Sequence, residues 1–148
     1  MKRMSKILPD MYKELFQPYH SKLCEYVHKH TSMHTAIHSC GSIYKLIPNL
    51  IDAGFEILNP VQTNCMDIDP QRLKTEFGKD ACFWGGGCDT VAVLNKATPA
   101  EVKAHVLERL KIFTPGAGFI MSTVHNILPE VPPENIVAAF DAVEEFYA

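Results

Sequence analysis

A histidine and a cysteine two residues apart, His38 and Cys40, are the side chains of this sequence best suited to chemistry. They end the segment Met33–Gly41, which is typical of a short strand that runs into a turn. Side chains alternate between the two faces of a strand, so we expect both to point the same way. Zinc binds imidazole and thiolate, and the pair therefore predicts half of a zinc site. The alternative is a half-buried strand that ends in these residue types without binding a metal.

Length and composition restrict the class of protein. The 148 residues correspond to one domain, residues 1–148, and a hydrophobic fraction of 47% is typical of a soluble globular protein. The formal net charge of -3 and the lack of a Lys/Arg cluster argue against nucleic acid as a partner. No apolar run reaches the roughly 18 residues of a membrane span. The basic residues after Met1 are not followed by the apolar stretch of a secretory signal.

The cysteines indicate a reducing compartment. Their number is odd, their spacing is irregular and they form no C-x-x-C pair; they are Cys24, Cys40, Cys65, Cys82 and Cys88. This pattern favours reduced thiols over a disulfide framework, and we expect a cytoplasmic protein. A cysteine with a chemical role here would act as an isolated ligand or nucleophile.

Predicted strands and helices alternate after an opening helical segment. Residues 8–30 carry apolar side chains at steps of three and four, which predicts one helix or two short helices joined near Pro18. Asp69-Pro70 and Thr98-Pro99-Ala100-Glu101 each combine an N-cap residue with proline, and each predicts a helix start. The remaining pattern predicts a strand ending at residue 40, strands at 55–59, 81–85 and 117–123, and helices at 43–52, 70–78, 99–113 and 132–147.

Four strands that alternate with helices predict a parallel α/β sheet. Such sheets bind their ligands at the carboxyl ends of the strands. Polar and metal-binding side chains collect at these predicted ends: His38 and Cys40, Asn59 and Gln62, Cys88 and Asp89, and Ser122, His125 and Asn126. We therefore expect the functional site at this end of the sheet.

A series of motifs extends over residues 7–147. They are His38-Ser39-Cys40-Gly41, Gly54–Gln62, Leu73–Gly78, Gly86–Thr90, Val124-His125-Asn126 and Pro132–Asn135. Together, and in this order, they resemble the uroporphyrinogen decarboxylase family. The His-x-Cys-Gly element is similar to the branch of methylcobalamin:coenzyme M methyltransferases and related corrinoid-dependent methyltransferases.

The resemblance implies a (β/α)8 barrel, which normally takes about 250 residues. This chain has four βα units preceded by a helix, and it matches the C-terminal half of the family. We therefore expect an α/β fold that is the C-terminal half of a TIM barrel. A half barrel exposes two sheet edges and one sheet face, both of which favour association. We expect a truncated or split family member that forms a homo-oligomer or binds a companion chain carrying the N-terminal half.

The methyltransferase branch also implies a site. His38, Cys40 and a third ligand would hold zinc (Zn2+) with one coordination position open. A small thiol similar to coenzyme M would bind there as thiolate and accept the methyl group of methylcobalamin or of a methyl-corrinoid partner protein. The family's third ligand is a cysteine near the end of the last strand. The matching position here holds His125, and Cys88 is the alternative ligand.

Three other polar residues have two interpretations each. Asn59 and Gln62 could bind the corrinoid or the thiol, or they could satisfy the loop backbone around Pro60. Asp89 could hydrogen-bond a histidine ligand and fix its tautomer, or it could cap the loop after the glycines.

Two other functions are consistent with the family. Uroporphyrinogen decarboxylase, an enzyme of porphyrin and haem biosynthesis, needs arginines that grip the substrate carboxylates. Of the arginines present, Arg72 and Arg109 fall on predicted helices, and Arg3 precedes the first of them. The third function is a non-catalytic half-barrel subunit or remnant, which would keep the fold and the metal ligands without turnover.

Overall fold

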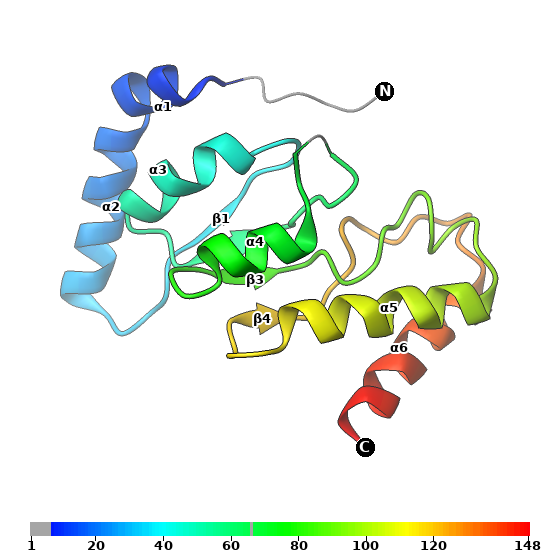
Figure 1. The fold of residues 1–148 in the computed structure, drawn as a ribbon. Coiled ribbons are helices and arrows are strands. Elements are labelled where there is room, and N and C mark those ends of the chain that lie inside the picture. The colour runs from blue at the N-terminus through cyan, green and yellow to red at the C-terminus, as the bar shows by residue number, and fades with distance from the viewer. Residues whose placement is uncertain (1–6, 66) are drawn as a thin grey trace.

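The computed structural model describes residues 7–65 and 67–148, which form one parallel sheet with helices (Figure 1). The strands lie in the order β1 (Ala36–His38), β2 (Ile57–Asn59), β3 (Cys82–Trp84) and β4 (Phe119–Ile120). Each neighbouring pair is parallel, so the chain returns to the same end of the sheet through a crossover between successive strands. The predicted parallel α/β sheet is confirmed.

Helices precede the sheet and connect its strands. The opening segment forms two helices, α1 (Pro9–Leu15) and α2 (Gln17–His30), with a break at Phe16. The later helices are η1 (Tyr44–Leu46), α3 (Ile47–Asp52), α4 (Pro70–Phe77), α5 (Pro99–Phe113) and α6 (Pro133–Tyr147). Among the described residues, no helix has the length and apolar character needed to cross a membrane.

Side-chain caps set the starts of α4 and α5. Asp69 Oδ1 accepts a hydrogen bond from the Arg72 N–H at 2.7 Å. Thr98 and Glu101 form the full capping box, in which each side chain accepts a hydrogen bond from the backbone N–H of the other residue. Both helices begin where the sequence predicts because these bonds satisfy backbone donors that the first helical turn leaves free.

The strands are shorter than the sequence pattern predicts. The fourth covers Phe119–Ile120 instead of residues 117–123. Ala117 and Gly118 have φ angles of 64° and 74°, which lie outside the β region, so strand pairing cannot begin before residue 119. Beyond the strand, an isolated bridge joins Thr123 to Cys88.

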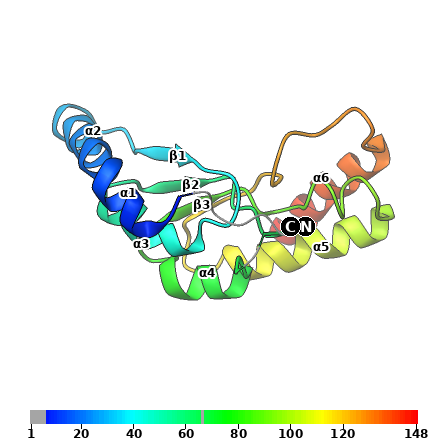
Figure 2. The same ribbon diagram turned by 90° about the horizontal axis from the view of Figure 1, so that it is seen from above.

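The core lies on one side of the sheet. Leu58 and Phe83 are buried on the helical side and pack in a cluster with Leu73 of α4 and Phe113 of α5. Figure 2 shows α3, α4 and α5 along this side of the sheet. A second cluster, which includes Val106, joins α5 to α6.

The opposite side of the sheet is open. Three side chains on this face are exposed, His38, Trp84 and Ile120. Along their strands they alternate with residues that face the helices. Strands β1 and β4 are both edge strands. In a closed barrel, this face would line the interior and neither edge would remain. The structure is therefore half of a TIM barrel.

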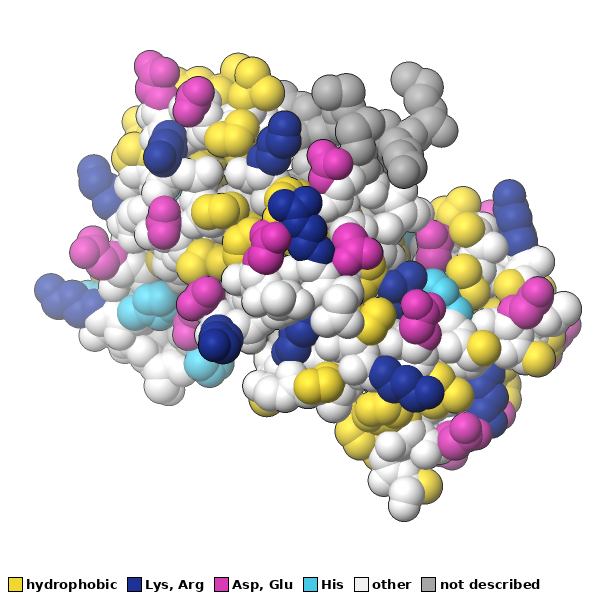
Figure 3. Space-filling model, in the orientation of Figure 1, with side chains coloured by type: hydrophobic (Ala, Val, Ile, Leu, Met, Phe, Trp, Pro, Cys, Tyr) yellow, Lys and Arg dark blue, Asp and Glu magenta, His cyan; other side chains and the backbone are white. Residues whose placement is uncertain are grey.

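Helices α2 and α6, at opposite ends of the molecule in Figures 1 and 2, also expose apolar side chains. On α2, Cys24 is buried, whereas Tyr19, Leu23 and Tyr26 are exposed. On α6, Phe140 is exposed on the side opposite the alanines that pack on α5. Figure 3 shows hydrophobic side chains at the surface in the regions of α1 and α6. A helix face of this kind is usually covered by another element.

Candidate functional site

His38 and Cys40 meet at the carboxyl end of β1. His38 is the last residue of the strand, Cys40 lies in the loop that follows, and both are exposed. His38 Nε2 and Cys40 Sγ are 3.2 Å apart. The shared orientation predicted from their spacing is confirmed, and the pair is accessible from solvent.

The turn after Cys40 depends on a glycine and on Gln62. Gly41 has a φ angle of 97°, in a region that residues with a Cβ rarely adopt. Its N–H donates a hydrogen bond to Gln62 Oε1 at 2.8 Å. Gln62 therefore supports the loop backbone beside Cys40 and not the backbone around Pro60, which was its predicted structural role.

Asn59 contacts His38 from the neighbouring strand. The two residues are register partners in β2 and β1, and Asn59 Oδ1 lies 2.6 Å from His38 Nδ1. The other amide atom, Asn59 Nδ2, donates a hydrogen bond to the carbonyl oxygen of Trp84 at 2.9 Å. One side chain thus links the ends of three strands. The sequence predicts that Asn59 lies near the site but not that it contacts His38, because strand register cannot be read from a local pattern.

Cys88 and Asp89 make structural contacts after β3. Cys88 is fully buried in the cluster between α5 and α6, and burial raises the pKa of its thiol to about 12. A raised pKa disfavours the thiolate that a metal site requires. Asp89 Oδ1 accepts hydrogen bonds from the N–H groups of Val91 and Ala92 at 2.8 and 2.9 Å, so Asp89 caps the loop.

His125 lies in the loop after the strand at the other edge of the sheet. It follows β4, whereas His38 ends β1, and these two strands are at opposite edges. His125 Nδ1 accepts a hydrogen bond from the Asn126 N–H at 2.8 Å, which leaves Nε2 for other partners. Within residues 7–65 and 67–148, no three His, Cys, Asp or Glu side chains are grouped so that they could hold a metal ion. The structure brings His38 and Cys40 together, but it does not add His125 or Cys88 to them.

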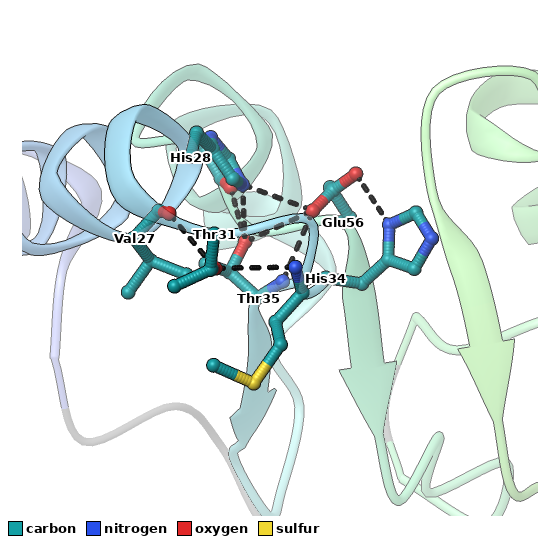
Figure 4. Close-up of polar contacts among 8 residues, drawn as sticks. Val27, His28, Thr31, His34, Thr35 and Glu56 are labelled. Atoms are coloured by element: carbon teal, nitrogen blue, oxygen red, sulfur yellow. Dashed lines mark hydrogen bonds and ion pairs between the residues drawn. The ribbon is translucent and has the colours of Figure 1, made fainter.

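A second polar cluster lies at the amino ends of β1 and β2 (Figure 4). Glu56 accepts hydrogen bonds from His34 Nδ1 at 2.8 Å and from His28 Nε2 and the Thr35 N–H at 3.0 Å each. The bond from His34, followed by those from Thr35 and His28, lowers the pKa of Glu56 to about 2. Because ligands of parallel α/β sheets bind at the carboxyl ends, we assign this cluster to the attachment of α2.

Comparison with known proteins identifies the family. The sequence model described as uroporphyrinogen decarboxylase (URO-D) matches residues 4–146. The chain belongs to this family. The search of curated proteins returned no match. Among solved structures, this family member is similar to a methyltransferase from Methanosarcina mazei, with a TM-score of 0.75 and 24% sequence identity. The match covers 96% of this chain and 39% of the methyltransferase, so the two share the fold over that part.

The His38–Cys40 pair fits two positions of the zinc site implied by the methyltransferase branch of the uroporphyrinogen decarboxylase family. Zinc bonds of about 2.05 Å to nitrogen and about 2.3 Å to sulfur, at a tetrahedral angle, place these atoms about 3.6 Å apart. His38 Nε2 and Cys40 Sγ are separated by 3.2 Å, which needs only a small adjustment. The contact of His38 Nδ1 with Asn59 is typical of the outer hydrogen bond of a metal-bound histidine.

Proposed function

We propose that this chain supplies the His-x-Cys part of a zinc-dependent site that transfers a methyl group from a methyl-corrinoid protein to a small thiol. The 3.2 Å contact between His38 Nε2 and Cys40 Sγ, at the end of the sheet where such folds bind ligands, is the main support. The similarity of the motif around Cys40 to the corrinoid-dependent methyltransferases adds to it. The name of the structural neighbour, a methyltransferase, is consistent with the same branch.

In this proposal His38 and Cys40 hold the metal through Nε2 and Sγ, and their exposure lets the substrates approach. When bound, zinc would supply the positive charge that stabilises the thiolate form of the substrate thiol, whose proton leaves to solvent. The thiolate sulfur forms a bond to the methyl carbon, while the carbon–cobalt bond of the donor breaks and its electron pair stays on cobalt. The loop held by Gln62 keeps Cys40 beside His38 throughout.

We propose His125 as the third ligand and retain Cys88 as the alternative. His125 is exposed and has an available Nε2, whereas Cys88 is buried and its pKa is raised to about 12. In an open sheet, three strand spacings of about 4.8 Å separate β1 from β4, about 14 Å in all. The curvature of a closed barrel would bring the ends of these strands closer together.

We further propose that additional βα units complete the mouth of the site. This chain spans 39% of the methyltransferase it is similar to, and β1 and β4 are both edge strands. A second copy of the chain or a companion chain with the other units would cover the open face. The corrinoid protein would then dock at the carboxyl end of the sheet.

The uroporphyrinogen decarboxylase reaction is less consistent with the described residues. Recognition of several carboxylates needs arginines near the carboxyl ends of the strands. Arg72 lies on α4 and pairs with Glu76 at 2.8 Å, and Arg109 lies on α5. Neither belongs to a strand end, and Arg3 lies outside the described residues.

Metal content is the direct test of this function. Elemental mass spectrometry of the purified chain should find about one zinc per chain, and His38→Ala and Cys40→Ala should each lose it. His30→Ala and Cys82→Ala, which change residues away from the pair, are the matched controls and should retain the metal. Methyl transfer would then be assayed with methylcobalamin and coenzyme M. A folded protein without zinc would overturn the proposal, and zinc without turnover would favour a non-catalytic subunit.

A further inference from the structure

We propose that Asn59 is a positioning residue that holds His38 in the tautomer with the proton on Nδ1, so that the lone pair of Nε2 faces Cys40. This inference rests on the proposed function, because its purpose is to prepare His38 as a ligand. It assigns to Asn59 a role different from binding the corrinoid or supporting a loop.

The contacts of Asn59 determine how its amide is oriented. The carbonyl oxygen of Trp84 can only accept a hydrogen bond, and it lies 2.9 Å from one atom of the amide. That atom must be the donor Nδ2, so the oxygen Oδ1 is the atom that faces His38. An amide oxygen can only accept, and at 2.6 Å from His38 Nδ1 it requires a proton on Nδ1.

The position of the proton on Nδ1 determines whether Nε2 can accept a hydrogen bond or bind a metal. A neutral imidazole carries one ring proton, so Nε2 has a lone pair. This lone pair is directed to the side of Cys40 Sγ, 3.2 Å away, where it can accept from the thiol or bind a metal beside the thiolate. In the opposite tautomer, an N–H would point at Cys40 and the metal position would be blocked.

The pairing of the strands places Asn59 between His38 and Trp84. His38 and Asn59 are register partners on adjacent strands, and Trp84 ends the third strand. Neighbouring strands of a sheet lie about 4.8 Å apart, which allows a short amide side chain to bridge from one to the next. A shift of β2 by one residue would move Asn59 to the other face and remove both contacts.

Two substitutions separate the accepting role of Asn59 from its volume. Asn59→Leu has a similar size but cannot accept from Nδ1–H, so His38 should lose its preference for this tautomer. Asn59→Asp retains an acceptor for Nδ1–H but loses the donor to Trp84, so it should keep the tautomer. Asn64→Leu, the same change at an exposed position in the loop that follows, is the matched control.

The tautomer can be read without any metal. Two-bond 1H–15N correlation spectra of the metal-free protein, in mildly alkaline buffer where histidines are neutral, distinguish the two tautomers. The His38→Gln spectrum identifies the His38 signals. We expect Nδ1–H for wild type, Asn59→Asp and Asn64→Leu, and a mixture or Nε2–H for Asn59→Leu. Circular dichroism of each variant verifies that it is folded.

Zinc affinity gives the second measurement. Competition with a chromophoric chelator should show about 10- to 100-fold weaker binding for Asn59→Leu and a smaller loss for Asn59→Asp. Wild-type tautomer and affinity in a folded Asn59→Leu would overturn the inference, as would identical behaviour of the Leu and Asp variants. If the wild-type chain binds no zinc, the proposed function fails, while the spectra still decide whether Asn59 sets the tautomer.

Discussion

Replacing Glu56 with glutamine should destabilise the fold in a pH-dependent way. Its carboxylate accepts hydrogen bonds from His34, His28 and the Thr35 N–H. It therefore joins the last turn of α2 and the segment before β1 to the start of β2 (Figure 4). Glutamine has nearly the same shape, but one of its two terminal atoms is an NH2 donor, so it cannot accept all of these bonds.

The lowered pKa of Glu56 sets the size of the effect. A decrease from 4.5 to about 2 corresponds to about 3.4 kcal/mol, at about 1.36 kcal/mol for each pKa unit. The Glu56 side chain is 41% exposed, and solvent screens a large part of such an interaction. We therefore expect Glu56→Gln to lower the free energy of unfolding by about 1 to 1.5 kcal/mol at neutral pH.

The sign of the pH dependence follows from the direction of the shift. Because the pKa is lower in the folded protein, the stabilisation is complete above about pH 4.5 and is lost as the pH falls towards about 2. Urea unfolding of wild type and Glu56→Gln at neutral pH and at several lower values measures this difference. Glu130→Gln, at an exposed loop carboxylate, is the control and should change little. Equal stabilities at neutral pH, or a difference that persists unchanged near pH 3, would refute the reasoning.

The remaining predictions concern packing, capping and association. Leu110→Ala removes a fully buried side chain between α5 and α6 and should lower the free energy of unfolding in urea by about 2 to 5 kcal/mol. Thr98→Ala breaks the capping box and should cost about 1 kcal/mol in the same assay, whereas Thr98→Ser should retain most of the stability. The isolated chain should self-associate at micromolar concentration, because Leu23 of α2 is 56% exposed and Phe140 of α6 is 67% exposed. Sedimentation should show a smaller mean mass for Phe140→Asp than for wild type, and a stable wild-type monomer would contradict this prediction.

Much of the fold could be predicted because its signals are local. The starts of α4 and α5 depend on Asp69 and Thr98, whose side chains bond backbone groups only three residues away. The strand segments were placed correctly but their lengths were overestimated. Ala117 has a positive φ angle, which delays the start of β4. Residues other than glycine rarely adopt such an angle, so the sequence does not predict it.

Some features of the candidate site could likewise be predicted from local sequence, and others could not. The spacing of two residues was enough to predict that His38 and Cys40 lie together, and the 3.2 Å contact agrees with this, although Cys40 lies in the loop after β1 and not on the strand. Other features depend on how distant segments fold together: Asn59 contacts His38, Cys88 is buried in the cluster of α5 and α6, and His125 follows the strand at the opposite edge of the sheet. These contacts join segments that are distant in the chain, so they depend on strand register, helix packing and sheet order rather than on any local pattern.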